Sequence, residues 1–218
     1  GAIGSSGSLM GALAPIPMAE AEKNGERVAK DIGAGTLAGL RALSAEKLLE
    51  VQGQFSSSID GYFLPKAPIE IYANGEQANV PLLIGGNSAE LPGEDLFGDK
   101  EPTLANFREI VKSTFGDKAD KVLELYKVTD EASVIAGATD YLSDTFIGFS
   151  TWKWSDIQKK TGGQPVFRYN YCHPRPDMVA AMGEKVPGLA GGVQDAPDKD
   201  VPTRPKATGA VHSADIEY

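Results

Sequence analysis

The most constraining feature of the sequence is the uninterrupted apolar run at residues 80–85 (VPLLIG). Such a run without polar alternation is typical of a parallel strand that is buried on both faces. The polar segment 86–90 (GNSAE) follows at once. In open α/β sheets, ligands and catalytic groups gather at the carboxyl ends of the strands. The run therefore predicts an α/β fold and makes residues 86–90 a candidate site.

Two further segments fit the same sheet. Residues 2–5 (AIGS) are short and apolar, which is consistent with a buried parallel strand, and the Gly-Ser run after them predicts a turn. Residues 165–172 (PVFRYNYC) are rich in aromatic and apolar side chains, as strands are. Together these segments predict a mostly parallel sheet.

Helices are predicted between the strands and are expected to cover the sheet. Gly33 is expected to end the first helix, and Ser44 to cap the third. The pattern predicts short or amphipathic helices at residues 18–32, 36–43, 45–51, 69–74, 103–115 and 118–126. Between the third and fourth helices, an Asp-Gly pair at residues 60–61 predicts a tight turn within a loop.

Residues 130–161 are expected to be helical throughout, with a division near Gly137. This stretch carries an aromatic stripe that we interpret as core packing rather than a ligand cage, because helical packing alone requires such spacing. The stripe consists of Tyr141, Phe146, Phe149, Trp152 and Trp154.

Length and charge exclude some classes of function. The 218 residues suffice for one domain or a large part of one. A net charge of -9 argues against nucleic acid or an anionic membrane as a partner, because both require a basic face. No apolar run approaches the length of a membrane span. The single cysteine, Cys172, cannot form a disulfide within the chain.

The segment at residues 209–218 (GAVHSADIEY) contains the strongest candidate for acid-base chemistry. His212 lies between a Gly-Ala pair and a turn-prone Ser-Ala-Asp, which predicts a loop position from which the side chain can reach a cleft. Imidazole titrates close to neutral pH, so it suits a general base. A surface or helix-capping histidine is the alternative interpretation of the same residues.

Two other interpretations use different residues. Cys172 and His173 could indicate a thiol hydrolase, but neighbours on a strand point to opposite faces, so thiol and imidazole would diverge. A metal site at His173 lacks further ligands. Glu90 could also be an ordinary solvated loop acid.

Several segments resemble the type-B carboxylesterases, the cholinesterase-like branch of the α/β-hydrolases. The histidine segment is similar to the family pattern Gly-x-x-His-x-x-(Glu/Asp)-Ile-x-(Phe/Tyr), and residues 81–90 are similar to Pro-(Leu/Met)-(Leu/Ile)-x-Gly-x-Asn-x-x-Glu. Residues 2–8 (AIGSSGS) and 60–65 (DGYFLP) resemble two further family segments. The resemblance covers nearly the whole chain and implies a partial α/β-hydrolase fold. It leaves the compartment open, a secreted or periplasmic location included.

The resemblance implies roles for individual residues. Glu90 falls on the acidic member of a Ser-Glu-His triad and His212 on the histidine, while Asp215 matches a second acidic position and is expected to support the loop by hydrogen bonding. Leu91 stands where the family has glycine, so Glu94 or Asp95 is the fallback acid. No cofactor or metal is implied.

The nucleophile of such a triad is missing from this sequence. No Gly-x-Ser-x-Gly and no HGGG-like run occurs in it. The resemblance therefore implies that residues 1–218 are the C-terminal portion of one catalytic domain, with an irregular loop or lid at residues 174–207. An upstream segment of the same protein would carry the serine, small-molecule esters would be the substrates, and this piece alone would be inactive. The alternative is a cholinesterase-like binding or adhesion protein without catalysis.

Overall fold

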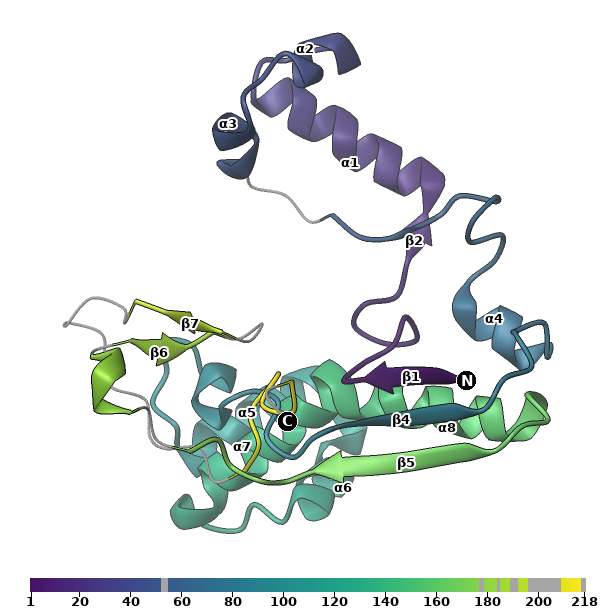
Figure 1. The fold of residues 1–218 in the computed structure, drawn as a ribbon. Helices are drawn as coiled ribbons and strands as arrows, with labels where there is room; N and C mark the ends of the chain where they lie inside the picture. The colour runs from purple at the N-terminus through teal and green to yellow at the C-terminus, as the bar shows by residue number, and fades with distance from the viewer. Residues whose placement is uncertain (52–54, 177–178, 184, 189–191, 196–208, 217–218) are drawn as a thin grey trace.

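The fold is built around a small parallel sheet (Figure 1). The computed structural model describes residues 1–51, 55–176, 179–183, 185–188, 192–195 and 209–216. Strand β4 (Leu82–Asn87) lies between β1 (Ala2–Ser5) and β5 (Val166–Tyr171) and is parallel to both. The three predicted strands and their parallel arrangement are confirmed.

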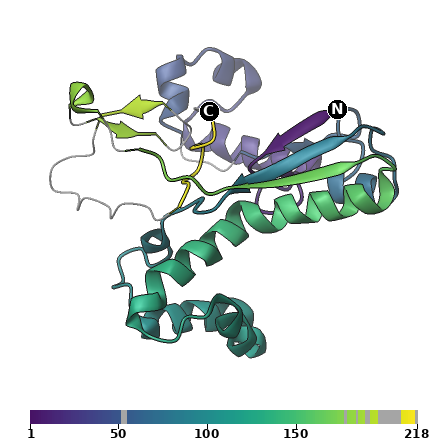
Figure 2. The ribbon, with the colours of Figure 1, turned by 60° about the horizontal axis from the view of Figure 1, so that its bottom comes forward.

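One face of the sheet is covered and the other is not. Helix α8 (Phe149–Thr161) runs beneath the sheet (Figure 2), where Leu82 and Ile84 are 2% and 0% exposed. On the opposite face, one row of paired residues, Ile3, Leu83 and Phe167, is 75%, 38% and 59% exposed. The expected burial of both faces is therefore wrong for the described residues, because no helix among them packs extensively on that second face.

The predicted N-terminal helices form but do not cover the sheet. They are α1 (Met18–Asp31), α2 (Leu37–Arg41) and α3 (Ala45–Leu49). The side chains of Thr36 and Ser44 cap α2 and α3. Figure 1 shows all three helices away from the sheet, with α1 against the two-stranded ladder of β2 (Ile16–Pro17) and β3 (Ser58–Ile59). Of the residues of α1, only Val28 and Ala29 are buried, so this helix covers little apolar surface.

The turn and the short helix that follow β3 agree with the sequence. The Asp60 carboxylate accepts hydrogen bonds from the backbone N–H groups of Tyr62 and Leu64, and Gly61 has a positive φ of 75°. Helix α4 (Pro68–Ala73) then packs against α8. The turn thus leads the chain back to the sheet layer.

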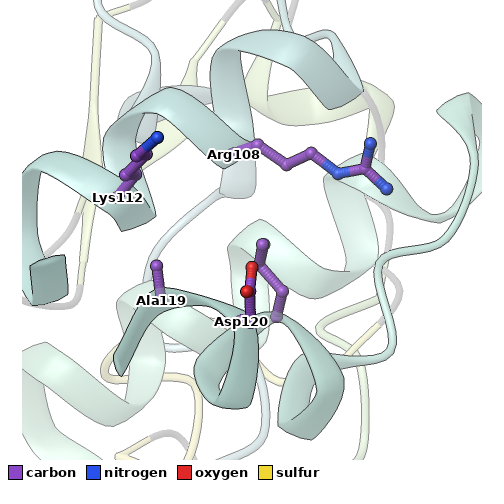
Figure 3. A pocket seen from close by; sticks show the side chains of 5 residues that line it. Arg108, Lys112, Ala119 and Asp120 are labelled. Carbon is purple, nitrogen blue, oxygen red and sulfur yellow. The ribbon is translucent and has the colours of Figure 1, made fainter. Parts of the chain in front are cut away.

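A helical layer follows β4. It contains the 3₁₀ turn η1 (Gly93–Leu96) and the helices α5 (Leu104–Phe115), α6 (Ala119–Tyr126) and α7 (Val134–Ser143), with short 3₁₀ turns at Gly116–Lys118 and Glu131–Ser133. Its core consists of Phe97, Phe107, Val111, Ala119, Val128, Val134, Ala138 and Tyr141. A hollow between α5 and α6 is lined by five residues of these helices, Arg108, Lys112, Ala119, Asp120 and Leu123 (Figure 3), and includes none of the predicted site residues.

The long helix divides at a different place from the one predicted. A π-helical turn at Asp144–Gly148 (η4) separates α7 from α8. Gly137 instead lies inside α7, where an added Cβ would stand 2.1 Å from Val128 Cγ2. Its missing side chain permits close packing against Val128. The predicted division at Gly137 is therefore wrong, because a glycine kept for packing gives the same sequence signal as a helix break.

The aromatic stripe belongs to several environments rather than to one core. Tyr141 is 6% exposed in the helical core, and the Trp154 ring lies under Gly4 of β1. Phe149 and Trp152 are 54% and 43% exposed, so the core interpretation is wrong for them. Phe146 contacts a residue of the candidate site, as shown below.

The range 174–207 is only partly described. It contains a 3₁₀ turn at Ala180–Met182 and the antiparallel pair β6 (Val186–Pro187) and β7 (Val193–Gln194). Residues 177–178, 184, 189–191 and 196–207 of the predicted lid lie outside the described residues, and so does Tyr218 of the histidine segment. No helix in the described part is both long and apolar enough to cross a bilayer.

Candidate active site

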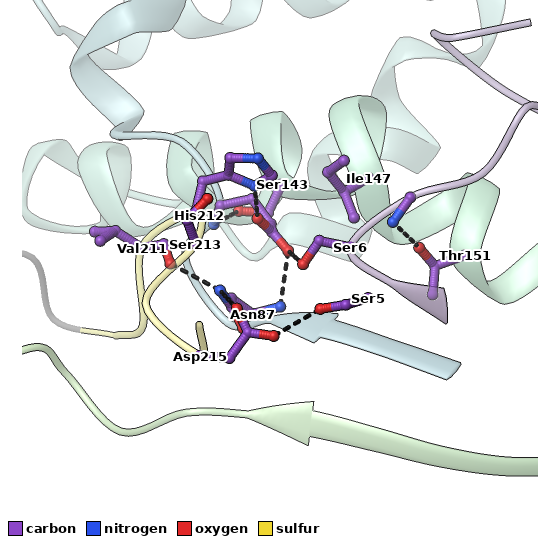
Figure 4. Close-up of polar contacts among 12 residues, drawn as sticks. Ser5, Ser6, Asn87, Ser143, Ile147, Thr151, Val211, His212, Ser213 and Asp215 are labelled. Atoms are coloured by element: carbon purple, nitrogen blue, oxygen red, sulfur yellow. Dashed lines mark hydrogen bonds and ion pairs between the residues drawn. The ribbon is translucent and has the colours of Figure 1, made fainter. Parts of the chain in front are cut away.

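The structure brings Glu90 and His212 together at the carboxyl end of β4. Glu90 Oε2 lies 2.6 Å from His212 Nδ1, although 122 residues separate them in the sequence (Figure 4). The Glu90 side chain is 1% exposed and that of His212 is 22% exposed. The carboxylate is thus enclosed, while the imidazole reaches the surface.

Backbone hydrogen bonds hold the two loops side by side. Ala89 N–H donates to the Ala210 carbonyl at 2.8 Å, and His212 N–H donates to the Glu90 carbonyl at 3.3 Å. Ala210 N–H donates to Ser88 Oγ at 3.0 Å. A Cβ added at Gly209 would lie 2.5 Å from that hydroxyl, so glycine permits this close approach. The separation of acid and imidazole is therefore set by the loop backbones as well as by the side chains.

The second carboxylate oxygen of Glu90 is held separately. Oε1 accepts hydrogen bonds from Asn87 N–H at 2.7 Å and from Ser6 Oγ at 3.0 Å. The backbone N–H of Glu90 donates to Ser143 Oγ at 3.0 Å. Because Oε1 has its own donors, Oε2 remains for His212.

Leu91 stands in place of the family's glycine, and this substitution does not prevent the contact between Glu90 and His212. His212 Nδ1 bonds Glu90 rather than the fallback acids Glu94 or Asp95.

The imidazole geometry favours one tautomer. A carboxylate can only accept a hydrogen bond, so Nδ1 carries the proton and Nε2 presents a lone pair. Within the described part of the chain, no hydrogen-bond partner of Nε2 is found. Nε2 is thus the nitrogen that can accept a proton from a hydroxyl group.

Asp215 fastens the histidine loop to all three strands of the sheet. Its carboxylate accepts hydrogen bonds from Ser5 Oγ at 2.7 Å, from Asn87 Nδ2 at 3.2 Å and from the Tyr169 hydroxyl at 3.3 Å. Asn87 Nδ2 also donates to the Val211 carbonyl at 2.8 Å (Figure 4). Burial opposes ionisation of Asp215, but the hydrogen bonds from Ser5 and Asn87 outweigh it, so the pKa of this carboxyl lies below its usual value.

The substitution Asp215→Asn is expected to destabilise the protein at neutral pH, by on the order of 1 kcal/mol, because neutral hydrogen bonds replace charge-assisted ones. The folded-state pKa is depressed, so the carboxylate's contribution is present above the unfolded value of 3.8 and is lost as the pH falls through the lower folded value. Urea unfolding from pH 7 to about pH 2 should therefore show the two proteins converging only below the unfolded value of 3.8. Asp31→Asn, which removes an exposed ion pair with Arg27, is the control and should cost little. A constant difference at every pH would contradict the prediction.

Some residues around the site were missed by sequence reasoning. Ser143 gave no local signal, because it meets Glu90 only through the packing of α7. Ser6 lay within a resembling segment without an assigned role, and its positive φ of 53° is unusual for a residue other than glycine. Phe146 was assigned to the core, but its ring centroid lies 5.4 Å from that of His212.

The alternative residues are placed differently. Cys172 is exposed, and its thiol sulfur exchanges hydrogen bonds with Asn170 of its own strand. Among the described residues, no group of His, Cys, Asp and Glu is suited to holding a metal ion.

Known proteins resemble this chain in sequence and in fold. The family model described as "Carboxylesterase family" matches residues 1–218. Fumonisin B1 esterase from Sphingopyxis macrogoltabida is 29% identical over an alignment of 138 positions, which covers 59% of this chain and 25% of that protein. Two structures of PNB esterase, each 18% identical with a TM-score of 0.58, cover 98% and 97% of this chain and 41% and 39% of their own.

The chain therefore spans about a quarter of the curated relative and about two fifths of the solved structures. The likeness to the solved structures establishes the α/β-hydrolase fold that the sequence predicted. The match along the whole sequence shows, in agreement with the resemblance, that this chain belongs to the carboxylesterase family.

Proposed function

We propose that this chain supplies the acid and the base of a Ser-Glu-His triad in a hydrolase of carboxylic esters. The observation that carries the proposal is the 2.6 Å contact between Glu90 Oε2 and His212 Nδ1 at the end of a parallel strand. The Glu90 carboxylate holds the proton on Nδ1 of His212, which leaves Nε2 basic and able to activate a hydroxyl nucleophile. Asp215 takes the supporting role, because it fixes the loop that carries His212.

The proposed reaction has two halves, acylation of the serine and hydrolysis of the acyl-serine, and His212 transfers a proton in each. Nε2 takes the proton of the serine hydroxyl while the serine oxygen bonds to the ester carbonyl carbon, and it then gives that proton to the departing alcohol oxygen. A water molecule then attacks the acyl-serine, with His212 again taking a proton and returning it to the serine oxygen. Glu90 stabilises the imidazolium that forms each time. On this proposal, the serine and the oxyanion donors would come from an upstream segment of the same protein.

Support for the substrate class comes from the relatives and from charge. The family relatives described above are named as esterases, which favours small-molecule carboxylic esters as substrates. The net charge of -9 favours neutral or cationic esters over polyanionic ones. Residues 1–218 alone should show no hydrolysis above background, because lost oxyanion donors alone cost about 3 kcal/mol or more of transition-state stabilisation.

A fluorophosphonate probe tests whether a serine is activated. In the full-length protein we expect covalent labelling at one serine within a Gly-x-Ser-x-Gly segment, located by peptide mass spectrometry. His212→Ala should slow the labelling at least a hundredfold, within the range that a general base contributes. His173→Ala replaces the only other histidine of this chain and should label at the normal rate. A protein that neither labels nor hydrolyses esters would be the non-catalytic binding protein instead.

A further inference from the structure

The π-helical turn Asp144–Gly148 lies at the candidate site rather than at an arbitrary point of the long helix. Turns of this kind are rare, and within helices they are frequent at functional sites. Ser143, which precedes the turn, accepts the hydrogen bond from the Glu90 backbone N–H. Ile147, inside the turn, is 2% exposed, and its Cδ1 and Cγ2 atoms stand 3.1 and 3.5 Å from the positions where Gly7 and Gly86 would carry a Cβ. Figure 4 shows Ser143 and Ile147 beside Ser6 and His212.

Phe146 is the member of this turn that meets the imidazole. The ring centroids of Phe146 and His212 are 5.4 Å apart, and the ring planes are inclined by 62°. This is an edge-type aromatic contact, the arrangement that ring quadrupoles favour. Phe146 is half-buried, unlike Phe149 three residues later, which is 54% exposed and pairs with Trp152.

The turn lets residues of one long helix reach the helical core, the underside of the sheet and the candidate site. Tyr141 before it belongs to the helical core, and Trp154 after it packs under the sheet. A π-helical turn contains one more residue than an α-helical turn would, which changes the direction of the following side chains by about 100°. In an uninterrupted α-helix, Trp154 would therefore point about 100° away from its present direction relative to Tyr141.

We propose that Phe146 is a positioning residue for His212, placed there by the π-helical turn. The hydrogen bond to Glu90 fixes the Nδ1 atom but leaves the imidazole plane free to swing about that bond. The Phe146 ring restricts this swing, so that Nε2 keeps its direction toward the serine. The catalytic consequence rests on the proposed function, whereas the restraint on the ring does not.

The test uses four variants of the full-length protein. Phe146→Leu and Phe146→Met keep apolar bulk without the ring, Phe146→Tyr keeps the ring, and Phe149→Leu is the matched control on the same helix. We expect the first two to lower kcat by roughly 2- to 12-fold, the range that an aromatic contact supplies, with KM within twofold. Phe146→Tyr and Phe149→Leu should retain kcat within about twofold of the parent value, which lies inside the scatter of such contacts.

A second readout does not depend on activity. With isotope-labelled histidine, NMR relaxation should show larger-amplitude motion of the His212 imidazole when the Phe146 ring is removed, and the parent amplitude in Phe149→Leu and Phe146→Tyr. Unchanged motion of the His212 imidazole in both Phe146→Leu and Phe146→Met, or a rise in KM with unchanged kcat, would overturn the proposal. If His212→Ala remains active, the proposed function fails, and the NMR comparison still decides whether Phe146 restrains the ring.

Discussion

Replacing His212 with alanine is expected to reduce kcat for a short-chain aryl ester by on the order of a million-fold in the full-length protein, as loss of the histidine does in another serine hydrolase. The reason is that Nε2 is the atom that must take and return the serine proton, and no other base in the described residues is aligned by a buried carboxylate. The measurement is steady-state hydrolysis with a chromogenic ester, with the residual rate compared with the rate in buffer.

The variant should remain folded. The His212 backbone N–H keeps its bond to the Glu90 carbonyl, and Glu90 Oε1 keeps its donors Asn87 and Ser6. Only Oε2 loses its partner, which costs roughly 1–3 kcal/mol for a buried polar group. Thermal unfolding checks this point. His173→Ala is the matched control and should keep near-normal kcat. Turnover of His212→Ala close to that of the parent protein would remove this residue from the mechanism.

Local sequence signals predicted the elements well because their causes are local. The strand at β4 was predicted from an apolar run, and the cap at Ser44 from a side chain that can bond the start of its own helix. The positions of α1 to α3 relative to the sheet were not predictable in this way. The place of these helices depends on which other apolar surface each of them packs against. The periodicity of apolar residues within one helix does not identify that surface.

Local sequence patterns likewise identified some residues of the candidate site and missed others. Glu90 and His212 could be identified because each lies in a segment that resembles a family pattern, and parallel strands bring their carboxyl ends to one edge. Phe146 and Ser143 could not, because they reach the site through a change of helical register. That change leaves no glycine or proline to mark where it begins, whereas Gly137, which looked like a break, serves packing against Val128.

The substitution Glu90→Gln is expected to lower kcat by about ten-thousandfold, the cost of losing the orienting carboxylate in a related triad. The hydrogen-bond network specifies why. In the variant, the oxygen of the new amide would keep the position of Oε1, because Asn87 N–H and Ser6 Oγ both donate to it. The amide NH₂ then faces His212 Nδ1, which must become an acceptor. The proton moves to Nε2, and the nitrogen that should accept the serine proton becomes a donor.

Glu90→Gln is expected to lose activity without losing stability, and this result would distinguish the variant from an unfolded protein. The thermal midpoint of Glu90→Gln should stay within a few degrees of the parent value, because both Oε1 bonds and the packing volume are preserved. Nitrogen NMR of the imidazole should show the proton on Nε2 in place of Nδ1. Glu94→Gln is the control, since Glu94 lies only a few residues further along and was the fallback acid. A comparable loss in that variant, with Glu90→Gln active, would transfer the acid role to Glu94 and leave the buried Glu90 carboxylate as a structural group.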